Sequence, residues 1–386
     1  MTRGTQHIFD VLREIDLSKI QTEAERRFQL LVVGTVPLAE RVAEALSLDD
    51  DKAGVHPWIV VRDVAEAPSG LTEADLVVMV SEGLEPSPAH ERWLQQSYQA
   101  SRPILNVIVG ETAERTVGAE LPRPLENARV LLPRLDDDTV ARLLVPELVR
   151  SLPEGLELAF ARHLPLLRTT VMQQLIEQTA RANALYSATT GLAGVVPILN
   201  LPLNVADFIV LTKNQLVMAY KIALAGGKTG EPQALVGEMA GVLGGGLLLR
   251  QLARELVGLV PVWGIVPNVV VSYAGTWTIG RGVEVWVTRG ERATQEELRR
   301  TYRQAVETGR VLARQLVEAG KARGRALWSP KSSNRSGPNI NIRVLPPPDK
   351  TDTEQGDAAS GTDGAHYGDV GDANLGETGS SDGAER

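Results

Sequence analysis

The sequence predicts an α/β domain with a parallel sheet, followed by an all-α domain and a disordered acidic tail. Within residues 28–153, short apolar runs alternate with helical patterns, which is typical of a three-layer fold with a parallel sheet between two layers of helices. After this region helical patterns take over, and they include two long apolar segments. The predicted parts are an N-terminal helix (1–27), the α/β domain (28–153), the helical domain (154–327) and the tail (328–386).

The composition excludes several kinds of site. The 386 residues carry a net charge of −8 and include no cysteine and five histidines. Residues 349–386 hold ten Asp or Glu against two Lys or Arg, so the remaining body is close to neutral. That body lacks the concentrated positive charge that nucleic-acid binding needs. Without cysteine and without closely spaced histidines, the sequence predicts no metal site and no cofactor.

The N-terminal segment predicts an amphipathic helix. Ile8, Val11, Leu12 and Ile15 are spaced for one helical face. Charges are spread along the segment and it has no apolar core, so it is not a secretory signal. We expect a packing helix, with a membrane-surface or partner-binding helix as the alternative.

Five apolar runs predict the strands of the α/β domain. They cover residues 28–34, 58–64, 74–83, 102–110 and 127–133. Helices are expected after the first strand, with Leu38, Val42 and Leu46 on one face, and at 88–100. The last helix of the domain begins with the acidic run 136–138, which suits the positive end of a helix dipole.

The order of these elements resembles a small GTPase domain of the Era-like type. The resemblance covers about residues 28–153 and rests on a strand leading into Gly34, a later strand carrying Asp63, the strand at 74–83, and a strand placed to end in the guanine-reading motif. It implies a GTPase-like, P-loop-like fold, in which Asp63 would stand at the magnesium-linked position.

The motif residues depart from that family. A phosphate-binding loop needs a second Gly followed by Lys and Ser or Thr, but Ala39, Glu40 and Arg41 stand at these positions. The strand that should lead into Asn-Lys-X-Asp ends at Gly110, so the base-reading Asp is missing. These departures predict a degenerate GTPase that has lost its nucleotide chemistry. A Gly-Lys-Thr at 227–229 follows a helix instead of a strand, so we interpret it as a helix C-cap.

Two apolar segments, 189–211 and 256–279, dominate the helical domain. Each is long enough to reach across a hydrocarbon core, and each is broken by prolines. They are either membrane-inserted or packed together as the core of a soluble helical domain. Arginines flank both segments, so a membrane hairpin would keep both flanks on the cytoplasmic side.

Part of this helical region resembles the C-terminal helical domain of unknown function found in YcjF-type inner-membrane proteins and some Era-like GTPases. The resemblance covers about residues 180–289. Its motifs are Pro202 with Ala206 and Asp207, Gln215 with Met218, the run 259–264, Gly275 with Thr276, and Gly280 with Arg281. It implies membrane association and no established reaction.

Polar residues within and around the apolar segments predict a buried network. A carboxylate such as Asp207 is costly inside an apolar helix unless it is paired or protonated. The candidate members are Asn204, Asp207, Lys213, Gln215, Asn268 and Arg281. We favour a role in docking the helices, with a polar functional site as the alternative. Glycines such as Gly275 and Gly280 would let helices approach closely.

A long amphipathic helix is expected at 294–325. Its predicted apolar face holds Leu298, Tyr302, Ala305, Val306, Leu312 and Leu316. Arginines lie elsewhere on the helix, so it either packs on the helical domain or also contacts anionic lipid. From residue 349 on, Gly, Ser, Asp and Thr dominate, which predicts disorder.

These observations lead to the hypothesis of a non-catalytic, membrane-associated protein with a pseudo-GTPase domain, acting as a scaffold or regulatory interaction module. Its partners would be membrane lipid or a membrane protein and no nucleic acid, and its helical domain allows a homo-oligomer. It would lie at the cytoplasmic membrane, integral or peripheral, with the α/β domain facing the cytoplasm. The alternatives are an enzyme, namely a GTPase with an atypical phosphate loop, and a soluble helical interaction protein in the cytoplasm.

Overall fold

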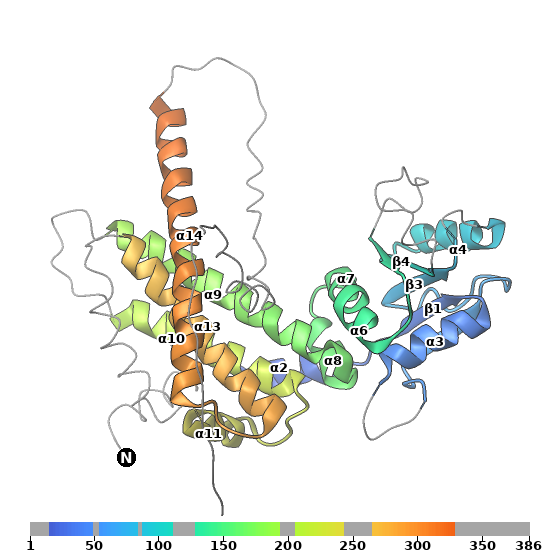
Figure 1. The fold of residues 1–386 in the computed structure, drawn as a ribbon, viewed down its shortest axis with the longest axis horizontal. Helices are drawn as coiled ribbons and strands as arrows, with labels where there is room; N and C mark the ends of the chain where they lie inside the picture. The colour runs from blue at the N-terminus through green and yellow to red at the C-terminus, as the bar shows by residue number, and fades with distance from the viewer. Residues whose placement is uncertain are drawn as a thin grey trace, which may run out of the picture. The chain divides into compact units, whose positions relative to one another are not determined.

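The computed structural model describes residues 15–48, 54–83, 87–110, 128–193, 205–242 and 265–328 (Figure 1). The N-terminal positions Ile8, Val11 and Leu12 and the predicted tail beyond Trp328 lie outside these residues. The first described helix is α2 (Leu17–Ala24), capped by Asp16. It buries Leu17, Ile20 and Ala24 and packs against helices of the later all-α region.

A five-stranded parallel sheet forms the centre of the α/β part, with the strand order β2-β1-β3-β4-β5. The strands are β1 (Leu30–Gly34), β2 (Ile59–Asp63), β3 (Leu76–Ser81), β4 (Ile104–Val109) and β5 (Arg129–Leu132). Each lies inside one of the five predicted apolar runs. In this doubly wound order, the chain changes direction across the sheet between β1 and β3.

Helices cover both faces of the sheet. Successive side chains of each strand point to opposite faces, so the apolar strands bury side chains against helices on both sides. Leu30 and Val32 of β1 face the core shared with α3 (Val36–Leu46) and α7 (Val145–Ser151). Leu31 and Val33 face α4 (Pro88–Gln99), whose Trp93 is fully buried. The prediction of an α/β domain with a parallel sheet covered on both faces is therefore confirmed.

The last helix of the α/β part is continuous but irregular. Asp136 caps its start, α6 (Asp137–Thr139) forms the first turn, and a π-helical turn at Val140–Leu144 leads into α7. Pro146 lies at the junction, where its missing N–H and its ring disfavour a regular α-helical turn.

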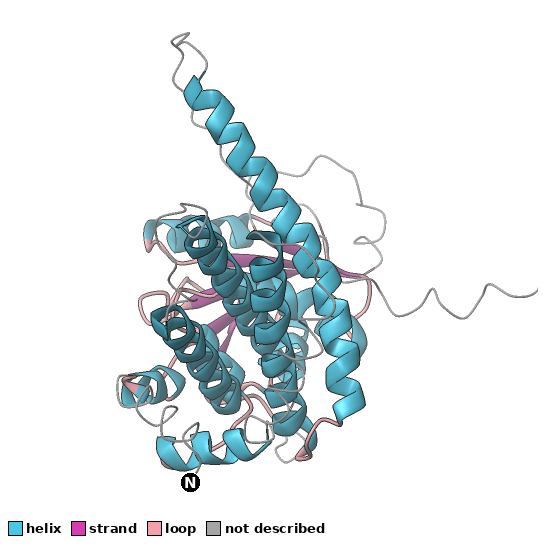
Figure 2. Cartoon of the chain, turned by 90° about the vertical axis from the view of Figure 1, so that its left-hand side faces the viewer, coloured by secondary structure: helices cyan, strands magenta, loops and turns pink. Residues whose placement is uncertain are grey.

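Helices follow the sheet, as predicted. They are α8 (Glu157–His163), a 3-10 turn (Pro165–Leu167), α9 (Arg168–Ala193), α10 (Val205–Ala225), α11 (Pro232–Val242), α13 (Ile265–Arg289) and α14 (Gln295–Trp328). The region from 156 onward thus begins with two helices separated at Pro165. Helix α13 packs against α9, α10 and α14, and Figure 2 shows these helices lying side by side.

Small residues let some of these helices meet closely. A Cβ on Gly280 of α13 would lie 2.6 Å from Ile176 Cγ1 of α9, so only glycine fits this contact. Gly309 of α14 likewise lies against the backbone of Val270. The prediction of close approach is confirmed at Gly280, whereas Gly275 has open space where its Cβ would be.

Within the described residues, neither of the two predicted apolar segments forms a long apolar helix. Helix α9 ends at Ala193 and α10 begins at Val205, so the middle of the segment 189–211 lies outside the described residues, as does the first part of the segment 256–279. Where the chain is described, no helix combines the length and the apolar character needed to cross a membrane. Helix α13 mixes its apolar residues with Thr276, Arg281 and Glu284.

Candidate functional site

The connection between β1 and α3 occupies the position of a phosphate-binding loop. Strand β1 ends at Gly34 and α3 begins at Val36, so Thr35 alone joins them. Pro37 stands in the first turn of the helix, where its missing N–H breaks no helical hydrogen bond. Leu38 and Ala39 already donate backbone N–H groups to the Thr35 carbonyl.

The three degenerate motif positions therefore lie within a helix instead of in a loop. Ala39 is fully buried in the core between α3 and the sheet, while Glu40 and Arg41 are exposed. Gly34 has a packing role, because a Cβ there would lie 2.8 Å from the Val80 carbonyl oxygen of β3. This geometry leaves no backbone to curl around a phosphate chain.

The other polar groups at the carboxyl ends of the strands serve local structure. Asp63 accepts a hydrogen bond from Ala65 N at 2.8 Å and so closes the turn after β2. Ser87 caps α4, and its hydroxyl lies 2.8 Å from His90 Nδ1. His90 Nε2 lies 3.3 Å from the Val80 carbonyl oxygen, so both ring nitrogens of this histidine have partners.

The Gly-Lys-Thr at 227–229 is a helix C-cap, as predicted. Gly227 has a φ of 82°, and Lys228 N donates to the Ala223 carbonyl, which closes the end of α10. The Lys228 ammonium lies 4.7 Å from the centre of the Trp286 ring. Arg162 donates to the carbonyl oxygens of Leu224 and Lys228, at 3.2 and 2.9 Å. The lysine is thus engaged with α13 and not with a phosphate site.

A buried polar layer joins three helices of the all-α region. Asn183 of α9 and Thr276 of α13 are both fully buried, and Asn183 Nδ2 donates to Thr276 Oγ1 at 3.0 Å. From α10, Gln215 Nε2 donates to the same hydroxyl at 3.0 Å. Asn214 Nδ2 donates to Asn183 Oδ1 at 2.8 Å. We call these four residues the polar layer.

Two further polar groups flank the polar layer. Tyr273 donates its hydroxyl to Glu177 Oε2 at 2.6 Å, and Glu177 also pairs with Arg181. Burial, together with this bond to the glutamate, raises the pKa of Tyr273. Near the other end of α13, burial raises the pKa of the Glu284 carboxyl, although its ion pair with Arg281 acts in the opposite direction.

The predicted network is only partly the observed one. Gln215 is a member of the polar layer, whereas Arg281 pairs with Glu284 one turn further along α13. Asn204 and the side chain of Asp207 lie outside the described parts of the chain. Lys213 and Asn268 are half-buried, and neither takes part in the three hydrogen bonds that define the polar layer.

Sequence reasoning did not place Asn183, Asn214 or Thr276 in the polar network, although Thr276 was named as a motif residue. The signal for Asn183 was its spacing: it lies three residues after Ala180 and seven after Ile176, both of which are fully buried on α9. An amide at such a position needs a buried partner on a neighbouring helix. The partners could not be identified from the sequence, because Thr276 is 93 positions away.

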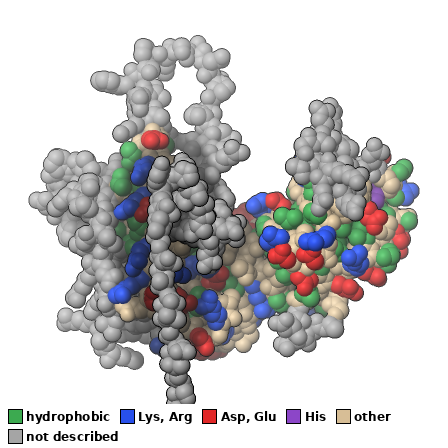
Figure 3. Space-filling view, in the orientation of Figure 1, with side chains coloured by type: hydrophobic (Ala, Val, Ile, Leu, Met, Phe, Trp, Pro, Cys, Tyr) green, Lys and Arg blue, Asp and Glu red, His purple; other side chains and the backbone are tan. Residues whose placement is uncertain are grey.

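Helix α14 is amphipathic along its length. Its apolar side packs on α13 through Tyr302, Ala305 and Leu312, as predicted. We call the opposite side, with Arg300, Arg303, Arg310 and Arg314, the arginine face. Figure 3 shows Lys and Arg side chains in a row along this helix.

The arginine face also carries acidic residues, of which Glu307 pairs with Arg310. Arg303 and Arg314 are exposed, and neither forms an ion pair with another described residue. The face therefore presents to the solvent two arginines that no acidic residue of the described chain pairs.

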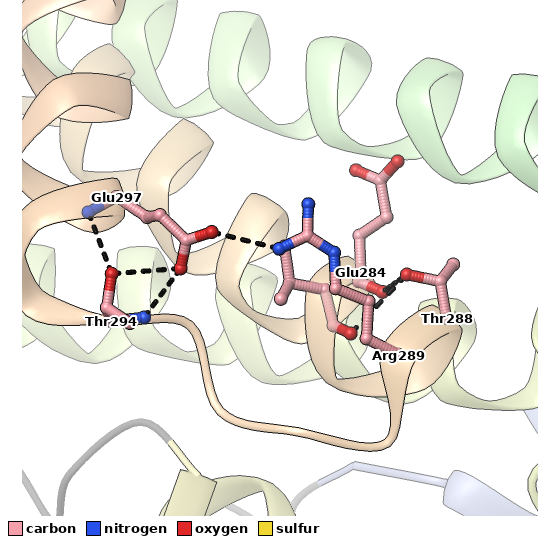
Figure 4. Close-up of polar contacts among 6 residues, drawn as sticks. Glu284, Thr288, Arg289, Thr294 and Glu297 are labelled. Atoms are coloured by element: carbon pink, nitrogen blue, oxygen red, sulfur yellow. Dashed lines mark hydrogen bonds and ion pairs between the residues drawn. The ribbon is translucent and has the colours of Figure 1, made fainter.

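The start of α14 is held by reciprocal hydrogen bonds (Figure 4). Thr294 Oγ1 accepts from Glu297 N at 3.2 Å, and Glu297 Oε2 accepts from Thr294 N at 2.8 Å, which is a capping box. Arg289 at the end of α13 donates to Glu297 Oε1 at 2.9 Å. These bonds and the Arg289 contact lower the pKa of Glu297 and fix the turn between α13 and α14.

The family models and the curated proteins searched gave no relative of this chain. No protein-family model matches the chain, and no curated protein matches it significantly.

Proposed function

We propose that this chain is a non-catalytic, membrane-associated interaction module, built from a pseudo-GTPase α/β domain and a helical domain of the YcjF type. The single-residue connection between β1 and α3 carries the non-catalytic part of the proposal. A phosphate-binding loop cradles the phosphates with several backbone N–H groups ahead of its helix and adds a lysine and a magnesium-binding hydroxyl. Here the helix begins before those groups could be placed.

The arginine face of α14 supports the membrane part of the proposal. A helix that buries one side in the protein and presents arginines on the other is suited to the headgroups of anionic lipids. Exposed apolar side chains occur on three neighbouring helices: Leu185 of α9, Val210 of α10, and Val266 and Val271 of α13. All four lie in or near the two apolar segments of the sequence. They give apolar surface that a membrane or membrane protein could cover.

Titration of the purified full-length protein with a fluorescent GTP analogue and Mg²⁺ tests the non-catalytic part. We expect no saturable binding in the micromolar range. Saturable binding that unlabelled GTP displaces, and that Asp63→Asn weakens, would mean that the α/β domain is a nucleotide-binding GTPase after all.

Membrane fractionation of the full-length protein tests the membrane part. We expect the protein in the membrane fraction, with release by high salt, alkaline carbonate or detergent showing how it is held. Recovery in the soluble fraction from the start would favour the soluble helical interaction protein instead.

Vesicle binding locates the lipid contact on α14. Removing two arginines with Arg303→Gln and Arg314→Gln should weaken binding to phosphatidylserine vesicles by about 2 kcal/mol, or roughly 30-fold, at about 1 kcal/mol for each arginine near the surface. The matched control, Arg41→Gln with Arg92→Gln, removes the same charge from exposed positions of the α/β part. Equal weakening by both pairs would show only a general charge effect and would contradict a contact through α14.

A further inference from the structure

The arginine face of α14 carries its positive charge in two separate places. Arg300 and Arg303 are exposed and lie about one turn apart, so their side chains are neighbours, with Cβ atoms about 5–6 Å apart. Arg314 is also exposed and lies eleven residues after Arg303, which is about three helical turns, or about 16 Å, further along α14. Three turns bring it back to the same side of the helix. The face therefore offers two positions for an anion.

The stretch between these two positions is close to neutral. Arg310 is the nearest cation to Arg314 on this face, and its guanidinium donates to the Glu307 carboxylate at 2.6 Å, so these two charges offset each other. Side chains on a helix lean toward its N-terminus, so Arg303 and Arg314 point the same way and do not converge. A single headgroup that contacts Arg300 and Arg303 therefore does not also reach Arg314.

An exposed apolar side chain lies between the two positions. Val311 is 48% exposed and lies eleven residues after Arg300, hence on the same side of the helix. An apolar side chain among arginines suits the boundary between lipid headgroups and acyl chains, whereas a soluble polyanion gives it no apolar partner. The other side of α14 packs on α13 through Tyr302, Ala305 and Leu312, so the arginine face is the side that a membrane would meet.

We propose that α14 binds an anionic lipid surface lengthwise, with Arg300 and Arg303 on one headgroup and Arg314 on a second. Because both contacts belong to one helix, the second forms at a high effective concentration once the first is made. Binding then rises with about the square of the fraction of anionic lipid. The protein would thus distinguish membranes by their charge density and not by a single lipid species. This inference rests on the proposed membrane association.

Binding of the full-length protein to vesicles of phosphatidylcholine with increasing phosphatidylserine measures the number of headgroups. Doubling the phosphatidylserine fraction should raise the affinity about fourfold for two headgroups and about twofold for one. Arg314→Gln removes the second contact, so it should weaken binding about fivefold and lower this response to about twofold. The matched control, Arg300→Gln, removes the same charge from the same face but leaves Arg303 on the first headgroup. It should also weaken binding, yet keep the fourfold response.

Single dyes measure how α14 lies on the membrane, because the chain has no native cysteine. Gln304→Cys and Gln315→Cys each place an environment-sensitive dye on an exposed position of α14, and the two positions are about 16 Å apart. On phosphatidylserine vesicles both dyes should shift to shorter wavelength to a similar degree. A dye on Gln96→Cys, an exposed site of α4, is the control and should not shift. A shift at only one of the two α14 sites would overturn the lengthwise contact.

The outcomes separate this inference from the proposed function. No binding of the unmodified protein to any vesicle would overturn both. Vesicle binding with the same response to phosphatidylserine content in Arg300→Gln and Arg314→Gln would keep the membrane association and refute the two-headgroup contact, because it would show a diffuse charge effect. Saturable binding of soluble inositol trisphosphate that Arg303→Gln abolishes would also refute it, since one polyanionic headgroup would then be enough.

Discussion

We expect the stability that the polar layer contributes to depend on the hydroxyl of Thr276. The substitution Thr276→Val tests this expectation. Valine has nearly the same shape as threonine, so the substitution removes the acceptor of two hydrogen bonds without leaving a cavity. Asn183 is fully buried and would keep a donor with no acceptor, which costs about 1–3 kcal/mol. Gln215 is only half-buried and can turn to water, so its loss is smaller. We expect a total destabilisation of about 2–4 kcal/mol.

Thr278→Val is the matched control for this prediction. Thr278 lies on the same helix and is also buried, but its hydroxyl donates to the Ala274 carbonyl of its own helix at 2.7 Å. That carbonyl can also accept a bond from the helix backbone, so no partner on another helix is left unsatisfied. The control should cost about 1 kcal/mol or less.

Hydrogen exchange followed by mass spectrometry provides the local measurement. Helices α9 and α13 should exchange roughly 30- to 1,000-fold faster in Thr276→Val, which corresponds to the expected 2–4 kcal/mol if they open as one unit. The strands of the sheet serve as an internal reference. The double variant with Asn183→Leu should lose less stability than the sum of the single variants, because it removes both partners together. Equal exchange in Thr276→Val and Thr278→Val would refute the view that this layer joins the helices.

Three further substitutions test other features of the helical region. Gly280→Ala should lower the thermal stability by about 1–3 kcal/mol in a melting experiment, because the new Cβ would overlap Ile176; an unchanged melting temperature would mean that the two helices can separate freely. The raised pKa of Glu284 means that the folded state holds this proton more tightly than the unfolded state, so its contribution to stability is lost as the pH rises from 4.5 through the raised value. Glu284→Gln should therefore remove a downward slope of stability in that range, and an unaltered pH profile would argue against it. Thr294→Ala should destabilise α14 by about 0.5–2 kcal/mol, detected as faster exchange confined to its first turns; exchange spread evenly along α14 would contradict a capping role.

Much of the α/β part could be predicted from the sequence because its signals are local. A run such as 28–34 is apolar at nearly every position, as a strand buried on both faces must be, and β1 was found inside it. The apolar side of α14 was predicted in the same way, since its residues repeat at helical spacing. The cap at 227–229 was predicted from glycine chemistry and confirmed by the positive φ of Gly227.

The candidate site was harder to predict because its bonds cross between helices. Gln215 was identified as a member of a polar network. Its partner Thr276 was not, and neither was Asn183, which donates to the same hydroxyl. Arg281 was one of the candidate members of a network around Asp207, and in the described residues it pairs with Glu284 on its own helix. Periodicity tells which side of a helix is buried, but it does not tell which helix will face that side.

The sequence by itself determined that a parallel sheet precedes a set of helices, that cysteine chemistry is excluded, and that the negative charge is concentrated after residue 349. These properties follow from composition and short-range periodicity. Only the tertiary structure decided that Thr35 alone joins β1 to α3, because the length of a loop depends on where the preceding strand meets its neighbours. It also decided which polar groups share a layer, since a hydrogen bond between residues far apart in sequence exists only once the helices are packed.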